Sequence, residues 1–150
     1  MGSDHAGYTL KSAVAADLIA RGHDLLDLGT SNDHTPVDWP DFGAAVARAV
    51  VSGQADCGVA VCGTGIGVAI AANKISGARA ATVHDVTSAR LAKEHNHANV
   101  LCLGARLLGN QVALEAVAAW LEASYGEGRH VARLEKLRQL DEQNLEPERG

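Results

Sequence analysis

Short apolar segments alternate with longer segments of helical periodicity along this chain. Four of the short segments are candidate strands, namely Leu25–Leu28, Cys57–Cys62, Ala78–Val83 and Asn99–Leu103. The segment Cys57–Cys62 is almost entirely apolar, which is typical of a strand in a parallel sheet that is covered on both faces.

Between these segments, apolar residues recur at helical spacing. The predicted helices cover Thr9–Ala20, Phe42–Val51, Val68–Lys74, Thr87–Glu94 and Gln111–Ala123. Alternation of strands and helices predicts right-handed βαβ units. The expected fold is therefore a single α/β domain over residues 1–150, a three-layer α/β/α sandwich around a Rossmann-like parallel sheet.

The C-terminal region has a different pattern. After Gly126 and Gly128, Arg129–Leu140 has the spacing of a charged amphipathic helix. Its apolar side could pack on the chain's own sheet or on a partner subunit, and the pattern leaves both open. The polar residues 141–150 are expected to form a frayed tail.

Composition narrows the class of ligand. Of the 150 residues, 47% are hydrophobic and 21% charged, as in an ordinary globular protein. The net charge of −5 and the 3% of aromatic residues argue against nucleic-acid binding. An anionic ligand would therefore need a local binding site.

The chain also carries features of a cytoplasmic protein. Its three cysteines do not suggest a disulfide framework and fit a reducing cytosol. The sequence contains no apolar run of membrane-spanning length and no secretory signal pattern. We expect neither a membrane nor a nucleic acid among its partners.

The strongest local motif is Cys62-Gly-Thr-Gly-Ile-Gly67, between a predicted buried strand and a helix. Glycines at such a place allow backbone N–H groups to form a nest for a phosphate or an oxyanion. The spacing matches neither the dinucleotide fingerprint nor the P-loop. Val68 occupies the position at which a thiol phosphatase needs arginine. A purely structural tight turn remains an alternative.

Cys62 lies at the mouth of this nest, where thiolate character is common. A simple core role is its alternative interpretation. Cys57 is five residues earlier, so the two side chains should point to opposite faces of a strand, and a metal pair is not expected. Cys57 and Cys102 are interpreted as small core residues.

Asp4 and His5 would share the edge of Cys62 if Met1–Ser3 ends a strand. Asp4 could also cap the following helix. His95 and His97 lack a third ligand at suitable spacing, so no metal site is expected. A single histidine there suits general acid–base chemistry better.

Arg129 and Arg133 are four residues apart on the C-terminal helix, so both guanidinium groups share a face. Such a pair suits phosphate capture, although pairing with Glu127 or Glu135 is the simpler alternative. Arg106 begins a turn at another strand end and could join the same anion site.

Together, these residues resemble the B-type ribose-5-phosphate isomerase family, which also includes galactose-6-phosphate isomerase subunits. The matching segments run from residue 2 to about 140, and they are Gly2–Tyr8, Gly29-Thr30, Asp38–Pro40, Cys62–Gly67, Ala71–Lys74, Glu94–Asn96, Asn99–Leu101, Gly104–Arg106, and Gly128–His130 with Arg133.

The resemblance implies a role for each matching residue. Cys62 corresponds to the catalytic base, His95 to the residue that opens the sugar ring, and Thr64 to a residue that helps move a proton between oxygens. The implied substrate-binding residues are Asp4, His5, Gly63, Gly65, Ile66, Gly67, Asn96, Arg106, Arg129 and Arg133. Family members are homodimers or dimers of dimers with sites built from two subunits, and the chemistry needs no cofactor and no metal.

Three positions depart from the family pattern. Family members carry several strand residues before Gly2, where this chain has Met1 alone, so we expect the native chain to begin upstream. Trp39 stands where tyrosine is common, and indole offers an N–H but no hydroxyl. Val68 replaces the glutamate base of one branch, which assigns this chain to the cysteine type.

The expected activity is aldose–ketose isomerisation of ribose 5-phosphate and ribulose 5-phosphate, as in the pentose phosphate pathway. One alternative is another sugar phosphate, such as allose 6-phosphate, galactose 6-phosphate or a tetrose 4-phosphate. A second is a non-catalytic sugar-phosphate sensor, which would not need Cys62.

Overall fold

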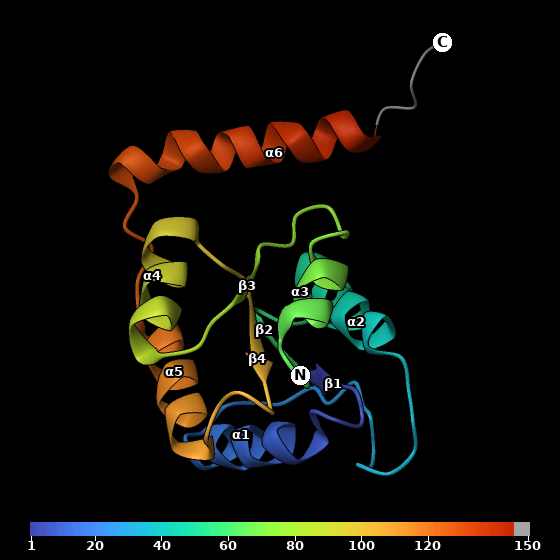
Figure 1. Cartoon of the computed structure of the whole chain (residues 1–150). Coiled ribbons are helices and arrows are strands. Elements are labelled where there is room, and N and C mark those ends of the chain that lie inside the picture. Colours follow the sequence, from blue (N-terminus) through green and yellow to red (C-terminus); the bar gives the residue numbers. More distant parts are fainter. Residues whose placement is uncertain (146–150) are drawn as a thin grey trace.

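In residues 1–145, which the computed structural model describes, four parallel strands form one sheet (Figure 1). They are β1 (Gly2–Ser3), β2 (Gly58–Cys62), β3 (Ala80–Thr82) and β4 (Val100–Gly104), in the spatial order β1-β2-β4-β3. All pairings are parallel, so the sheet has one edge of carboxyl ends and one of amino ends.

Helices cover both faces of this sheet, as the alternating pattern predicts. Their bounds are α1 (Tyr8–Ala20), α2 (Trp39–Val51), α3 (Ile66–Ala72), α4 (Val86–Asn96), α5 (Asn110–Glu122), the 3₁₀ turn η1 (Gly128–His130) and α6 (Val131–Leu145). Helices α1, α4 and α5 pack on one face, and α2 and α3 pack on the other. The three-layer α/β/α prediction is confirmed.

The central strand β2 shows how the sequence forms two cores. Val59 and Val61 belong to the cluster on the face of α1, α4 and α5. Ala60 and Cys62 belong to the cluster on the opposite face. Side chains alternate between the faces of a strand, so an unbroken apolar run is what a doubly covered strand requires. Cys57 packs against the first cluster, away from Cys62, as predicted.

The predicted strand Leu25–Leu28 is wrong, because this segment has no regular strand geometry. It lies beside β1 and forms irregular backbone hydrogen bonds there. The N–H of Leu28 donates to the Met1 carbonyl at 2.8 Å, and that of Ser3 donates to the Gly29 carbonyl at 2.8 Å. Its apolar residues therefore cover the side of β1 without joining the ladder.

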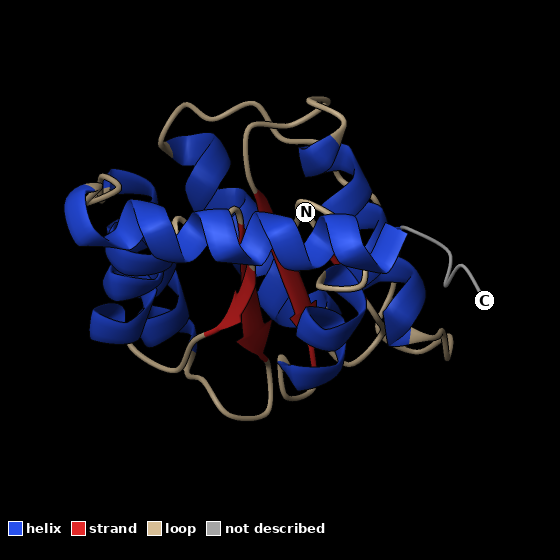
Figure 2. Cartoon of the chain, turned by 90° about the horizontal axis from the view of Figure 1, so that it is seen from above, coloured by secondary structure: helices blue, strands red, loops and turns tan. Residues whose placement is uncertain are grey.

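Helix α6 lies across the amino edge of the sheet (Figures 1 and 2). It runs to Leu145, so the predicted tail is wrong for residues 141–145, and residues 146–150 lie outside the described part. No residue of α6 is buried. A cavity of about 520 Å³ separates Leu134, Leu137 and Leu140 from the segment 77–81 below.

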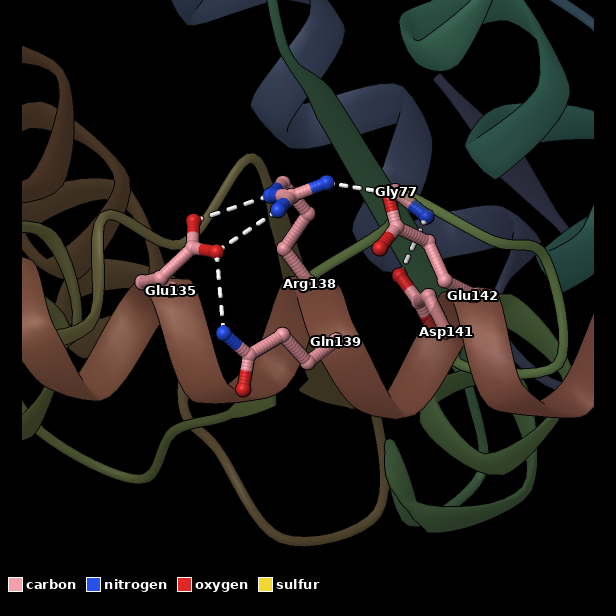
Figure 3. Close-up of polar contacts among 6 residues, drawn as sticks. All are labelled: Gly77, Glu135, Arg138, Gln139, Asp141 and Glu142. Atoms are coloured by element: carbon pink, nitrogen blue, oxygen red, sulfur yellow. Dashed lines mark hydrogen bonds and ion pairs between the residues drawn. The ribbon is translucent and has the colours of Figure 1, made fainter.

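One hydrogen bond fixes the far end of α6 to the body of the domain. The N–H of Gly77 donates to Asp141 Oδ2 at 2.8 Å (Figure 3). On the helix surface, Arg138 donates to Glu135 and Glu142. The hydrogen bonds that Glu135 accepts from Arg138 and Gln139 lower its pKa to about 2. None of the helices in residues 1–145 has the length and apolar character needed to cross a membrane.

Trp120 is the largest fully buried side chain of the domain, and it provides a test of the core. Its indole Nε1–H donates to the Ala98 carbonyl at 3.1 Å. We expect Trp120→Ala to lower the free energy of unfolding by about 3–5 kcal/mol, because it leaves a cavity and an unpaired carbonyl. Urea denaturation measures this, and a loss below about 1 kcal/mol would contradict the packing described.

Candidate active site

Cys62 ends the central strand β2 at the carboxyl edge of the sheet. Its side chain is 4% exposed, and its Sγ accepts a hydrogen bond from the N–H of Gly65 at 3.2 Å. Open α/β sheets bind ligands at this edge. This hydrogen bond ties the sulfur to the backbone of the loop that follows β2.

The glycine loop after Cys62 is packed tightly against the end of β4. Gly65 has a φ of +75°, and a Cβ there would lie 2.9 Å from the carbonyl carbon of Leu103. A Cβ on Gly104 would lie 2.6 Å from the Thr64 carbonyl. The Thr82 hydroxyl donates to the Gly65 carbonyl at 2.9 Å. The loop is thus held by backbone contacts that leave no room for larger residues.

The remaining loop residues differ in their surroundings. Thr64 is partly buried, and its Oγ1 accepts from the N–H of Ile66 at 3.3 Å. Ile66 is exposed at the start of α3. The ring of Trp39 lies over Gly67, where a Cβ would approach it to 2.8 Å. Trp39 therefore covers one side of the loop, a contact that sequence reasoning did not predict.

Asp4 and His5 follow β1 directly and lie at the same edge as Cys62, as predicted. Asp4 is 5% exposed, and its Oδ1 accepts from the N–H of Gly7 at 2.9 Å. The N-cap of α1 is Gly7, so Asp4 is not the cap that its position suggested. His5 Nδ1 accepts from the N–H of Val37 at 3.2 Å, which leaves Nε2 to carry the proton and donate to a ligand.

Arg106 joins this group from the turn after β4. Its backbone N–H donates to the Gly63 carbonyl at 2.9 Å. Its guanidinium lies beside the loop, with Nη1 3.2 Å from the place of a Cβ on Gly63. The carboxyl edge thus combines a thiol, backbone N–H groups, an acid, a histidine and an arginine.

The other predicted residues lie at the opposite edge of the sheet. Helix α4 leads from the carboxyl end of β3 to the amino end of β4, so His95 and Asn96 at its end lie by the amino edge. The five residues of β2 span about 16 Å between the two edges. A single chain therefore does not bring His95 to Cys62.

Several cationic groups gather around His95. Its ring stacks on that of His130, with centroids 4.6 Å apart and planes 17° from parallel. Burial and the nearby charges of His95, Arg129 and Arg133 lower the pKa of His130, so at neutral pH it is mainly uncharged. Neither arginine pairs with an acid within residues 1–145, and Glu135 binds Arg138 instead. Sequence reasoning missed the stacking of His130, although it singled out the segment Gly128–His130.

The other thiols and His97 have surroundings unlike those of Cys62. Burial and the nearby Cys62 raise the pKa of Cys102, and burial raises that of Cys57. The ring of His97 stacks on Tyr125 at 4.5 Å. No three His, Cys, Asp or Glu side chains in the described part of the chain are grouped as metal ligands.

Comparison with known proteins identifies the family. The Ribose/Galactose Isomerase family model matches residues 1–137. The chain belongs to this family. It is 42% identical over 142 residues to ribose-5-phosphate isomerase B of Escherichia coli K12, covering 94% of each protein.

Solved structures agree with this assignment. Ribose-5-phosphate isomerase B of Clostridium thermocellum has a TM-score of 0.93 and 46% identity, over 95% of this chain and 96% of that one. The Mycoplasma genitalium protein, solved with bound ribulose-5-phosphate, has a TM-score of 0.90 and 37% identity, over 95% and 94% of the two chains.

The contact between Gly104 and Thr64 provides a test of the loop geometry. We expect Gly104→Ala to displace the loop, because a Cβ would lie 2.6 Å from the Thr64 carbonyl. Turnover of ribose 5-phosphate should fall about 100-fold, since a displacement of catalytic groups by about 1 Å can lower the rate by this factor. Gly109→Ala is the control, because a Cβ there meets nothing within 4 Å. Equal rates for both variants would contradict the described packing.

Proposed function

We propose that this protein interconverts D-ribose 5-phosphate and D-ribulose 5-phosphate through an enediolate. The observation that carries this proposal is the buried Cys62 thiol at the head of a glycine loop, with an N–H at its sulfur. Membership of a family whose relatives include ribose-5-phosphate isomerase B supports it.

The proposed reaction uses the groups at the carboxyl edge. Cys62 takes the proton from C2 of the open-chain aldose, which forms the enediolate, and returns it to C1. Thr64 helps transfer the proton that O2 loses to O1, so that C2 becomes the carbonyl of the ketose. The N–H groups of Gly63 and Gly67 stabilise the developing oxyanion by about 3–4 kcal/mol per well-placed donor. The N–H of Gly65 donates to the Cys62 sulfur and that of Ile66 to Thr64 Oγ1, so these two residues hold the catalytic groups in place.

The remaining groups bind the substrate and open its ring. Asp4 and His5 bind near the sugar ring, and Arg106 beside Gly63 offers a cation for the phosphate or the sugar. His95 catalyses ring opening, with Asn96 beside it. Arg129 and Arg133, unpaired with acids in residues 1–145, are available for the phosphate. The roles proposed for these side chains require no metal and no redox cofactor.

The proposed site is built from two copies of the chain in a homodimer or a dimer of dimers. Cys62 and His95 lie at opposite edges of the sheet, so the Cys62 of one copy has to meet the His95 of another. Exposed apolar side chains are available for such an interface, and they are Ile66 and Ile70 of α3 with Val131, Leu137 and Leu140 of α6. The three free cysteines support a place in the reducing cytosol.

Replacement of the thiol tests the base. We expect Cys62→Ala to reduce kcat for ribose 5-phosphate by at least about 10³-fold, within the range that general bases contribute. Binding of ribose 5-phosphate, measured by calorimetry, should change little. The control is Cys57→Ala, which removes a thiol from the opposite face and should retain wild-type kcat.

Different outcomes separate the alternatives. Unchanged turnover in Cys62→Ala would refute the role of the thiol. If the folded wild-type protein converts only allose 6-phosphate, galactose 6-phosphate or a tetrose 4-phosphate, that sugar phosphate is the substrate in place of ribose 5-phosphate. Binding of sugar phosphates without any turnover would favour the sensor.

Mixing of two inactive variants tests the composite site. A mixed dimer of Cys62→Ala and His95→Ala chains contains one intact site if each site takes Cys62 and His95 from different copies. After the two are unfolded and refolded together, activity should rise to about a quarter of the wild-type rate, since half of random dimers are mixed. Mixing two separately tagged batches of Cys62→Ala is the control. Absence of recovery in proven mixed dimers would place both groups of a site in one chain.

A further inference from the structure

Lys11 is the one lysine in residues 1–145 that is fully buried, with 1% of its surface exposed. It lies on α1, on the same face as Val14 and Leu18, which pack into the core. Lysine is almost never buried to this extent without partners, because desolvation of its charge is costly. The proposed chemistry uses no residue of α1, so this burial needs another explanation.

The ammonium of Lys11 has two strong partners in the segment that follows α1. Its Nζ donates to Asp27 Oδ1 at 2.7 Å and to the Thr30 carbonyl at 2.8 Å. Asp27 Oδ1 also accepts from the N–H of Gly29 at 2.9 Å. Partial burial of the carboxyl group opposes ionisation, but these hydrogen bonds prevail and lower the pKa of Asp27. The ion pair therefore fixes both ends of the turn at residues 27–30.

The turn at residues 27–30 also holds the backbone just before Asp4. The N–H of Ser3 donates to the Gly29 carbonyl, and the N–H of Thr30 donates to the Ser3 carbonyl, both at 2.8 Å. Ser3 is therefore bonded on both sides to residues that Lys11 restrains. Asp4 and His5 follow without another secondary-structure element between them and Ser3.

The first turn of α1 restrains the chain on the far side of His5. The backbone N–H of Lys11 donates to the Gly7 carbonyl at 2.9 Å, a helical hydrogen bond that does not depend on the lysine side chain. The N–H of Gly7 donates to Asp4 Oδ1 at 2.9 Å. The lysine side chain therefore restrains the backbone before the pair Asp4–His5 through Ser3, and the start of α1 restrains the backbone after the pair through Gly7.

We propose that Lys11 is a positioning residue for substrate binding, acting through Asp27 and Thr30 to hold Asp4 and His5 at the carboxyl edge. This inference rests on the proposed function, which gives Asp4 and His5 their contact with the sugar phosphate. Lys11 itself is enclosed by protein and acts through these backbone contacts. Loss of its ammonium leaves the Thr30 carbonyl and the Asp27 carboxylate without their partner.

The decisive variant is Lys11→Met, which keeps the length of the side chain and removes its charge. We expect its kcat/KM for ribose 5-phosphate to fall about 10–100-fold, with the larger part in KM, because misplaced binding groups weaken substrate binding. Asp27→Asn should shift KM in the same direction by a smaller factor. The double variant should be no worse than Lys11→Met, because both act through one contact.

Hydrogen–deuterium exchange gives a readout that does not depend on activity. In Lys11→Met, amides in residues 2–7 and 28–30 should exchange at least about 10-fold faster than in the wild type, since local opening costs less. The control is Trp120→Phe, which removes the buried hydrogen bond to Ala98 at the amino edge and lowers global stability. The Trp120→Phe variant should keep the wild-type KM. The exchange rate of residues 2–7 relative to that of the rest of the chain should also stay unchanged.

A purely structural role would give a different result. If Lys11→Met lowered the melting temperature but kept the wild-type KM and the exchange of residues 2–7, the proposal would be overturned. If Lys11→Met does not fold, Asp27→Asn decides, and an unchanged KM and exchange in that variant overturn the proposal. If the wild-type protein does not convert ribose 5-phosphate, the proposed function fails, while the exchange data still decide the role of Lys11.

Discussion

All four strands of the sheet run in the same direction, and this constraint divides the polar groups of the chain into two sets. The carboxyl edge receives whatever follows β1, β2 and β4, which are Asp4–His5, the loop after Cys62 and the turn with Arg106. The amino edge receives the end of α4 and, across it, η1 and α6. Each crossover helix returns the chain to the amino edge, so residues close in sequence can lie at opposite ends of the domain. The separation of Cys62 from His95 follows directly from this direction.

Close backbone contact gives the carboxyl edge its chemistry. The loop after Cys62 contacts the end of β4 at a place where both segments have glycine. The Gly65 N–H therefore reaches the sulfur of Cys62. Side chains at Gly65 or Gly104 would fill the space that this turn needs. The three cysteines consequently have different surroundings, because within residues 1–145 only Cys62 combines the end of a strand with a donor at its sulfur. Cys102 lies deep in the core, where burial raises its pKa.

The amino edge has charge and apolar surface that a single chain does not cover. His95 and His130 stack there beside Arg129 and Arg133, and the charges of these neighbours contribute to the lowered pKa of His130. Helix α6 passes above this edge with its leucines over a cavity, and Asp141 holds its far end at Gly77. Helical stability in proteins usually comes from a packed apolar face. The exposed face of α6 and the two arginines, which pair with no acid in residues 1–145, are therefore consistent with the two-copy site that we propose.

Local patterns in the sequence determined much of this protein. The apolar run at residues 57–62, the helical spacing around it and the glycines after Cys62 predict a doubly covered parallel sheet with an anion-binding loop, because these signals depend only on neighbouring residues. Tertiary structure decided what depends on distant residues. It placed Leu25–Leu28 beside β1 without strand geometry, and it set His95 at the edge of the sheet away from Cys62. It also buried Lys11 against Asp27 and Thr30. The periodicity of α1 places Lys11 on a buried face, but its ion-pair partner lies 16 residues away, and only the folded chain brings the two together.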